Sequence, residues 1–437
     1  MEPASVLTKQ ERIAKLARER PQMAFTSLNH YLDADWLGLA YQRTRKDGAV
    51  GVDGQTAEDY AAQLERNLQS LIERLKSGRY RAPPVRRHYI DKPGGGQRGL
   101  GIPTFEDKVA QRAIAMLLEP IYEQDFLDCS FGFRLSRNAH QALRVLRDGI
   151  MRNRGYWVLE VDVRKYFDSI SFAKLREMLA SRVTDGVVRR LIDKWLKAGV
   201  LEAGQVHYPG SGTPQGGVIS PLLANVYLHH VVDAWFAREV QPRLRGPSTL
   251  VRYCDDFVML FANRDDAERV LAVLGKRLEK FGLQMHPDKT RLVDFRPRLS
   301  TPASVETTLP TTFNFLGFTH LWGKSRKGRA VVRQFTAKDR IARTLKAINQ
   351  QCRRIRHWPL HEQHRRLSRM LRGHFAYFGI SGNFRRLAAV QVAARSLWRK
   401  WLSRRSWTSG LSWERFGRVI AHLPLPRARI VHCYVTS

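Results

Sequence analysis

The sequence predicts an α+β protein in which a mixed region of helices and strands is followed by a purely helical segment. Short apolar runs bounded by turn residues indicate strands as far as about residue 320, and helical patterns lie between them. Beyond Lys338 the apolar residues instead recur every three or four positions, which is typical of amphipathic helices around a small core.

The elements of the mixed region follow from these patterns in order. Residues 11–80 are mostly helical, and leucines at a spacing of three or four predict a helix over Ala57–Lys76 that ends at Ser77-Gly78. The other helices expected are Asp107–Phe126, Val187–Ala198, Pro221–Arg238 and Asp266–Phe281. The expected strands are Val85–Asp91, Arg98–Ile102, Trp157–Val163, Leu250–Cys254 and Phe257–Phe261. Residues 298–310, rich in Ser, Thr and Pro, read as a loop or hinge.

Three apolar stripes follow Lys338 and predict a three-helix bundle with basic outer faces. The stripes consist of Ile341, Leu345, Ile348 and Ile355, then Leu367, Leu371, Phe375 and Phe378, and finally Leu387, Val390, Ala394, Leu397 and Trp401.

The charge of the chain points to a polyanionic partner. Its 74 Lys and Arg against 40 Asp and Glu give a formal net charge of +34, which suits a nucleic acid backbone. No apolar run reaches the roughly 18–20 residues of a membrane span, and the charged N-terminus does not read as a signal peptide. The four cysteines are scattered, which supports neither a disulfide framework nor a zinc site and favours a cytoplasmic setting.

Three aspartates are candidates for metal-dependent chemistry. Asp255 and Asp256 separate two apolar strands, so we expect a tight hairpin with both carboxylates at its tip. Asp162 ends another apolar strand, where a carboxylate without a cation nearby would be unfavourable. Nucleotidyl transfer uses two Mg²⁺ ions held by such carboxylates. An Asp-Asp pair alone is also common in solvated turns, so the third acid and its context decide the interpretation.

Several blocks in order resemble the reverse transcriptase/maturase proteins encoded by bacterial group II introns, over nearly the whole chain. The run Tyr253-Cys-Asp-Asp256 resembles the family's Tyr-x-Asp-Asp box, with Cys where the family usually has Ala. Asp162-Val-Arg-Lys-Tyr-Phe-Asp168 is similar to its first catalytic block, and Gly212-Thr-Pro-Gln-Gly-Gly217 begins its most distinctive signature. The further matches are Arg98–Pro103, Cys129–Arg134, Phe315–Phe318, Leu371–Phe378 and Pro426–His432.

The resemblance implies a site for each step of DNA synthesis. It places two Mg²⁺ ions, for which Mn²⁺ is a possible substitute, in a metal set of Asp162, Val163, Asp255 and Asp256. The residues implied to contact the nucleotide are Lys92, Arg98, Phe167, Gln215 and Lys289. Lys92 and Arg98 would clamp the triphosphate, the bulk of Phe167 would exclude a 2′-hydroxyl, and Lys289 would protonate the pyrophosphate. An exposed basic hairpin, a core phenylalanine and a surface lysine are the structural alternatives.

The resemblance also implies a right-hand polymerase. It consists of an N-terminal extension (1–35), fingers and palm (36–330), a helical thumb or maturase domain (331–395) and a basic DNA-binding region (396–437). The side chains expected to bind nucleic acid are Arg340, Arg343, Arg353, Arg354, Arg365, Arg366, Arg399, Lys400, Arg404 and Arg405, with tryptophans between them. Solvated helix faces with core tryptophans are the alternative.

The implied function is RNA-directed DNA synthesis together with binding of a group II intron RNA, which assists splicing and mobility by target-primed reverse transcription. The expected partners are intron RNA, an RNA template, a DNA primer, a DNA target and dNTPs, in a nucleoid-associated ribonucleoprotein. Two alternatives stay open at this point. One is a domesticated reverse transcriptase used in phage defence or DNA repair, and the other is an RNA-binding maturase without catalysis, against which the three intact acids argue.

Overall fold

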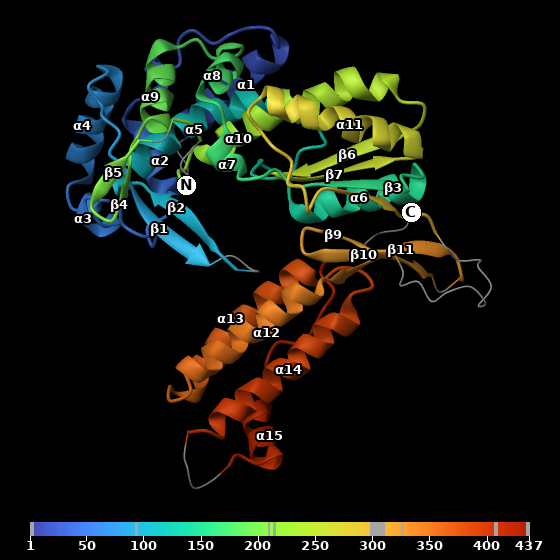
Figure 1. The fold of residues 1–437 in the computed structure, drawn as a ribbon. Coiled ribbons are helices and arrows are strands. Elements are labelled where there is room, and N and C mark those ends of the chain that lie inside the picture. Colours follow the sequence, from blue (N-terminus) through green and yellow to red (C-terminus); the bar gives the residue numbers. More distant parts are fainter. Residues whose placement is uncertain are drawn as a thin grey trace. The chain divides into compact units, whose positions relative to one another are not determined.

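The computed structural model describes residues 4–91, 95–208, 210–212, 216–297, 311–325, 327–405 and 410–433. The chain forms two compact units. The first contains Met1–Ala142 and Leu159–Leu292, and the second contains Leu143–Val158 and Val293–Ser437. Helices and strands mix in the first unit and a bundle of helices dominates the second, which confirms the α+β prediction (Figure 1).

A four-stranded sheet of order β2-β1-β4-β5 lies in the first unit. Its strands are β1 (Val85–Asp91), β2 (Gln97–Ile102), β4 (Val200–Glu202) and β5 (Gln205–His207). The hairpin of β1 and β2 is antiparallel, with Ile90 opposite Arg98, as the basic hairpin of the sequence predicts. The short strands β4 and β5 were not expected.

A second sheet carries the aspartates and has the order β6-β7-β3-β8. Its strands are β3 (Trp157–Val161), β6 (Ser248–Tyr253), β7 (Asp256–Phe261) and β8 (Arg291–Asp294). Because Tyr253 pairs with Asp256, the two turn residues are Cys254 and Asp255, and Asp256 already belongs to β7. The prediction that both carboxylates occupy the tip was therefore wrong by one residue.

The helices of the first unit supply its core. α5 (Phe105–Asp125) is mostly buried and packs against α1 (Ala4–Glu19) and α2 (Ala34–Arg43). The others are α3 (Ala57–Ala61), α4 (Leu64–Lys76), α7 (Tyr166–Ser169), α8 (Phe172–Ala180), α9 (Gly186–Leu196), α10 (Ser220–Leu228) and α11 (Arg264–Lys280). α10 continues as two π-helical turns, His229–Asp233 and Phe236–Val240, and short 3₁₀ turns cover Asn29–Tyr31 and Gln241–Arg243. The single helix expected over 57–76 is divided between α3 and α4.

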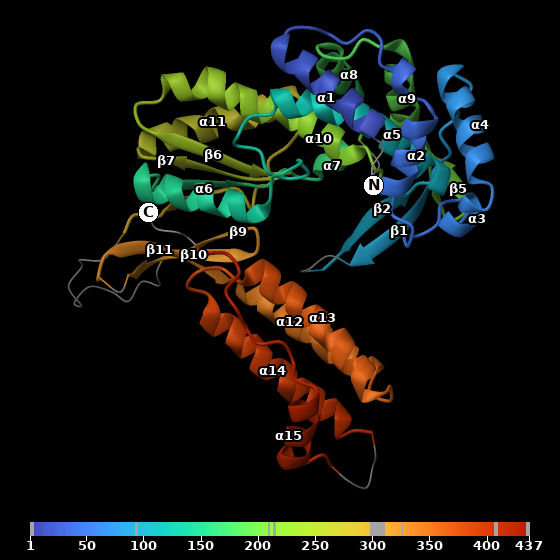
Figure 2. The same ribbon diagram turned by 180° about the vertical axis from the view of Figure 1, so that it is seen from behind.

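The second unit combines a small sheet with helices (Figure 2). The sheet has the order β11-β10-β9, with β9 (Phe313–Phe315), β10 (Phe318–Lys324) and β11 (Ala330–Thr336). The helices are α12 (Lys338–Arg354), α13 (Leu360–Phe378), α14 (Phe384–Leu402) and α15 (Trp413–His422), and most of α6 (Ala139–Arg152) belongs to this unit as well. α12 packs against both α13 and α14, as the three stripes predict.

The stripe of α13 is confirmed, since Leu367, Leu371, Phe375 and Phe378 are buried. In the other two stripes Ile341, Leu345, Leu397 and Trp401 are only partly covered, and the buried tryptophan of α14 is Trp398. None of the described helices is long and apolar enough to cross a membrane. The loop expected at 298–310 lies outside the described residues.

Candidate active site

Asp162 directly follows the buried strand β3 and is fixed through its main chain. Its carbonyl accepts a hydrogen bond from the His286 amide at 2.8 Å, and the Arg164 amide donates to the Gln284 carbonyl at 2.8 Å. Between them Val163, 4% exposed, forms an antiparallel bridge with Met285. These bonds hold the two residues that the sequence assigns to the metal, Asp162 and Val163, against the segment that follows α11.

Asp255 sits in the turn between β6 and β7 and is mostly covered. Burial raises the pKa of its carboxyl, and the nearby charge of Asp162 raises it further. The charges of Arg98 and Arg252 act in the opposite direction. The strand β3, which Asp162 follows, is the sheet neighbour of β7, which Asp255 precedes, so the fold places these two acids, 93 positions apart in the sequence, on neighbouring strands. Asp256 is the exposed first residue of β7.

Two predicted cations accompany these acids. The Lys289 ammonium forms an ion pair with Asp162 at 2.9 Å, across 127 residues of sequence. Arg98 is exposed on β2, and its charge acts on Asp255. Basic groups near the acids suit an incoming triphosphate, and Lys289 is in direct contact with one of them.

Phe167 lies on α7, partly exposed, and Gly212, the first residue of the glycine-rich signature, approaches its main chain closely. A Cβ on Gly212 would come within 2.9 Å of the Phe167 carbonyl oxygen, and one on Gly216 within 2.5 Å of the Gly101 carbonyl oxygen. Both glycines have positive φ, so only glycine fits these close approaches. Gly212 is thereby packed against α7 and Gly216 against β2. Gln215 and Lys92, also predicted to contact the nucleotide, lie outside the described residues.

The family model described as "Reverse transcriptase (RNA-dependent DNA polymerase)" matches residues 90–320, which is more than half of the chain. The chain belongs to the reverse transcriptase family. The matched range contains the Asp162 block, the glycine-rich signature and the β6–β7 turn. The predicted resemblance is thus confirmed.

Relatives in this family include intron-encoded proteins. The chain is 41% identical over 226 residues to the group II intron-encoded protein LtrA of Lactococcus lactis, covering 51% of this chain and 37% of LtrA. It is 33% identical over 320 residues to protein YkfC of Escherichia coli, covering 65% of this chain and 83% of YkfC. Nuclear intron maturase 1 of Arabidopsis thaliana is 30% identical over 199 residues, 40% of this chain and 27% of that protein. The chain therefore spans little more than a third of the length of LtrA.

Reverse transcriptase domains depend on divalent metal ions, and the donor chemistry of this site fits one. Carboxylate oxygens are the ligands that Mg²⁺ prefers, and a cation would relieve the repulsion between Asp162 and Asp255. Over the described parts of the chain, however, no three His, Cys, Asp or Glu side chains are already arranged as a metal site. The Lys289 ammonium bonds the Asp162 carboxylate instead, so a metal ion would compete with it.

The basic residues predicted to bind nucleic acid differ in what they contact in the second unit. Some form ion pairs with nearby acids: Arg340 and Arg343 share Asp339 at 3.4 Å, and Arg365 lies 3.9 Å from Glu362. Two others donate to carbonyl groups, Arg399 to Leu411 at 2.7 Å and Arg405 to Trp358 at 2.5 Å. Others surround Trp401, whose ring centroid lies 5.9 Å from Arg353, 5.7 Å from Lys400 and 5.2 Å from Arg404. Arg354 and Arg366 are exposed.

A cavity of about 410 Å³ opens beside Arg353, at the C-terminal end of α12. Its lining contains Arg353, Arg354, Arg356 and His357, together with Gln350, and no acidic side chain. Such a cavity suits phosphate groups.

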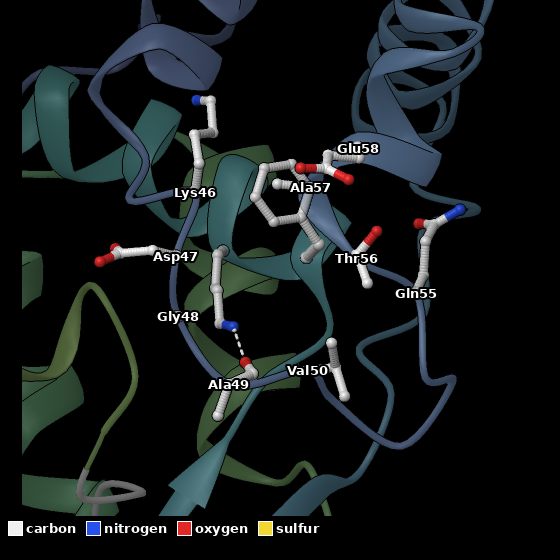
Figure 3. Close-up of a pocket in the computed structure, with 11 residues that line it drawn as sticks. Lys46, Asp47, Gly48, Ala49, Val50, Gln55, Thr56, Ala57 and Glu58 are labelled. Atoms are coloured by element: carbon white, nitrogen blue, oxygen red, sulfur yellow. Dashed lines mark hydrogen bonds between the residues drawn. The ribbon is translucent and has the colours of Figure 1, made fainter. Parts of the chain in front are cut away.

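A cavity of about 380 Å³ in the first unit has a different character (Figure 3). Residues 46–50 and the start of α3 form its walls, and the Lys108 ammonium donates to the Ala49 carbonyl at 2.6 Å (Figure 3). Its charged groups are mixed, with Asp47 and Glu58 beside Lys46 and Lys108. None of the residues predicted for the active site lines it.

Sequence reasoning missed the buried network beneath the Asp255 turn. Arg252 and Asp233 form an ion pair at 2.6 Å in which both side chains are 0% exposed. The available signal was an arginine inside the apolar run Leu250-Val-Arg-Tyr253, because a buried guanidinium requires a buried partner. The partner, Asp233, lies on a π-helical turn after α10, and nothing in the sequence around it indicates that it pairs with Arg252.

Proposed function

We propose that this chain is an RNA-directed DNA polymerase that extends a DNA primer on an RNA template with the help of two Mg²⁺ ions. The observation that carries the proposal is the placement of Asp162 and Asp255 at the neighbouring strands β3 and β7, with Lys289 paired to Asp162. When bound, the metal ions lower the barrier by activating the primer 3′-hydroxyl and neutralising the leaving pyrophosphate. Asp162, Asp255 and Asp256 hold them, with Val163 at the same site.

The chain's own residues orient the nucleotide. Arg98 binds the triphosphate, and Lys92 does the same from across the hairpin turn. Phe167 lies under the sugar and excludes a 2′-hydroxyl, and Gln215 contacts the nucleotide or the primer end. Lys289 donates a proton to the departing pyrophosphate. Its ion pair with Asp162 supports this role, because it keeps the ammonium at the site before the substrate enters.

In this proposal the chain is a right-hand polymerase. Residues 36–330 supply the fingers and palm, residues 331–395 the thumb and residues 396–437 a DNA-binding region, after an extension over residues 1–35. The sheet that carries the aspartates and the bundle of α12 to α14 support this assignment.

Primer extension on an RNA template with Mg²⁺ and dNTPs tests the catalytic proposal. Asp255→Asn should remove several kcal/mol of transition-state stabilisation, which corresponds to a loss of roughly 1,000-fold in rate. Asp193→Asn is the matched control, because Asp193 lies on α9 and pairs only with Arg176 in the described ion pairs. Product formation that Asp255→Asn leaves unchanged would contradict the proposal, and an inactive wild type would favour a maturase without catalysis.

We further propose that the second unit binds group II intron RNA and thereby assists splicing and mobility. The support is charge: residues 331–437 contain 23 Lys and Arg against 3 Asp and Glu, a net +20. The basic cavity at the end of α12, lined by Arg353, Arg354 and Arg356, is part of this surface. Binding to intron RNA should exceed binding to an unstructured RNA of equal length. Primer extension without preferential intron binding would favour a role independent of an intron, as in defence or repair.

A further inference from the structure

The guanidinium of Arg252 lies inside the first unit with every donor engaged. It has five N–H donors in a fixed planar arrangement. Nε and Nη2 donate to the two Asp233 oxygens at 2.7 and 2.6 Å, and Nη2 also donates to Ser130 Oγ at 2.7 Å. Nη1 donates to Asn225 Oδ1 at 2.9 Å and to the Cys254 carbonyl at 3.1 Å. Five donors thus make five bonds, each to a different acceptor atom.

One of those bonds reaches the main chain immediately before Asp255. Cys254 has φ of +58°, a left-handed conformation that residues with a Cβ seldom adopt without support from their surroundings. Its carbonyl belongs to the peptide that joins it to Asp255. A bond from a buried guanidinium to this oxygen therefore restrains the direction in which the Asp255 side chain leaves the turn.

The segment Cys129–Gly132 closes the turn from its other side. The Arg252 amide donates to the Cys129 carbonyl at 2.7 Å, and the Phe131 amide donates to the Arg252 carbonyl at 2.9 Å. Asn225 joins the two parts, since its Nδ2 donates to the Gly132 carbonyl at 2.7 Å while its Oδ1 accepts from Arg252. The contact is close enough that a Cβ on Gly132 would lie 2.5 Å from the Cys254 nitrogen.

An ion pair that only stabilises the fold would not need a hydrogen bond to the turn that carries Asp255. The first unit contains two other well-covered arginine pairs, Arg182 with Asp125 and Arg134 with Glu123. Their guanidinium groups donate to carbonyls of other segments, such as Ala17 and Leu127, and not to the Asp255 turn. Buried ion pairs add little net stability, and their best-supported use is to select one arrangement of the chain.

We propose that Arg252 is a positioning residue for the catalytic site. Through the Cys254 carbonyl it holds the β6–β7 turn so that the Asp255 carboxylate stays beside Asp162. Asp233, Asn225 and Ser130 hold Arg252 in turn. This inference rests on the proposed polymerase function, but metal binding tests it separately.

The test compares two lysine substitutions. Arg252→Lys keeps the charge opposite Asp233 but cannot make the forked contacts to Asn225 and the Cys254 carbonyl. Arg182→Lys is the control, because Arg182 is similarly buried in the same unit. It pairs with Asp125 and has no described contact with the β6–β7 turn. Both variants should lower the melting temperature, so stability alone does not distinguish them.

Two measurements should respond only to Arg252→Lys. Binding of Mn²⁺ alone, followed by the EPR signal of the free ion without nucleic acid, should weaken about 10- to 100-fold, as for other groups that orient metal ligands. In primer extension kcat should fall by a similar roughly 10- to 100-fold, since small misplacement of a reacting group has effects of this size. KM for dNTP should stay nearly constant, because the nucleotide contacts remain.

An Arg252→Lys protein that is folded and matches Arg182→Lys in both Mn²⁺ affinity and kcat would overturn the proposal. If Arg252→Lys does not fold, Ser130→Ala replaces it, because this change removes only one acceptor of the network. It should weaken Mn²⁺ binding in the same direction, and a Ser130→Ala protein equal to wild type would also overturn the inference. An inactive wild type would refute the polymerase proposal, while the Mn²⁺ comparison would still decide the role of Arg252.

Discussion

Arginines occur in two different settings that a comparison of the two units brings out. In the first unit Arg252, Arg182 and Arg134 have side chains that are 0%, 6% and 4% exposed, and each is bonded to a carboxylate. In the second unit Arg343 and Arg365 are 41% and 66% exposed. Acids are scarce there, as residues 331–437 contain only three. The three arginines of the first unit therefore fix the fold, while the two of the second unit keep their charge largely exposed to solvent.

This contrast has an energetic basis. Exposed ion pairs contribute about 0–1 kcal/mol, so the second unit gains little by supplying acids for its arginines. A buried guanidinium without its acid is far less favourable, because water no longer solvates it. The same kind of substitution should therefore lower the stability of the protein when it is made at a buried pair of the first unit. At an exposed arginine of the second unit it should lower the affinity for nucleic acid instead.

The largest expected effect comes from removing a buried acid. Asp233→Ala leaves the Arg252 charge buried without its carboxylate, so the free energy of unfolding should fall by about 3–5 kcal/mol. Asp339→Ala removes the exposed acid shared by Arg340 and Arg343 and should change it by less than about 1 kcal/mol. Urea denaturation measures both values. Equal losses in the two variants would refute the contrast.

Replacing one glycine in each unit by alanine tests the same comparison, because the two substitutions should have opposite effects on stability. A Cβ on Gly132 would meet the Cys254 nitrogen at 2.5 Å, so Gly132→Ala should destabilise the protein by about 1–3 kcal/mol through overpacking. Gly373 lies in the exposed face of α13, and a Cβ there meets nothing within 4 Å. Gly373→Ala should stabilise the protein by about 0.5–1 kcal/mol through helix propensity. Thermal melting should move in opposite directions, and a Gly132→Ala protein as stable as wild type would show that the turn is less tightly packed than described.

Nucleic acid affinity should respond only to the second unit. Changing both Arg353 and Arg354 to Gln should weaken RNA binding roughly ten-fold, about 1.4 kcal/mol. The slope of log affinity against log salt should fall by up to about 2, one for each lost phosphate contact. The control is Lys15→Gln with Arg264→Gln, which removes the same charge from exposed helices of the first unit. Equal slopes in the two double variants would mean that net charge alone, and not this surface, determines binding.

The fold was predictable where local pattern controls it. β1 has the predicted bounds, Val85–Asp91, because Pro84 precedes it and a glycine-rich turn follows. The helix expected over 57–76 divides because the Tyr60 carbonyl accepts from the Asn67 side chain at 2.9 Å, at the point where the backbone leaves the helical conformation. Periodicity does not reveal such a side-chain bond.

Strands β10 and β11 escaped prediction for a related reason. Their inward-facing residues include His320 and Gln334, 0% and 1% exposed, whose side chains lie 3.4 Å apart. Polar residues at buried positions conceal the alternation by which a half-buried strand is recognised. The Gln334 amide also donates to the Leu143 carbonyl at 3.2 Å, a partner 191 positions away.

In the candidate site, too, local sequence pattern indicates some residues but not their long-range contacts. Motif and strand pattern were sufficient to select Asp162 and Asp255, because acids in apolar runs are conspicuous in the sequence. The ion pair of Lys289 with Asp162 joins residues 127 positions apart, and Asp233 reaches Arg252 from a π-helical turn. Only the tertiary structure brings these groups together.

The smallest expected effect concerns pH and a histidine buried between helices of the second unit. Burial lowers the pKa of His374 from 6.5 to about 4, and its Nδ1 lies 3.2 Å from the Thr344 hydroxyl. The unfolded chain therefore takes up a proton near pH 6.5 while the folded chain does not. Stability from this group is fully present above pH 6.5 and is lost progressively as pH falls towards 4. Between pH 7 and 6 the loss should be under about 1 kcal/mol.

His374→Gln removes one of several buried histidines whose pKa is lowered, others being His229, His230 and His320, and should make this part of the curve of melting temperature against pH less steep. The first unit supplies the opposite case, because burial raises the pKa of Asp107 to about 6 although Tyr80, Trp195 and Gln111 donate hydrogen bonds to it. Its contribution to stability is full below pH 3.8 and decreases as pH rises to about 6. Asp107→Asn should therefore make the loss of stability steeper as pH falls from about 6 to 3.8, and it should change the slope between pH 7 and 6 by less than His374→Gln does. If His374→Gln keeps the wild-type slope between pH 7 and 6, the imidazole is not buried as described, and the acid sensitivity of this unit has another source.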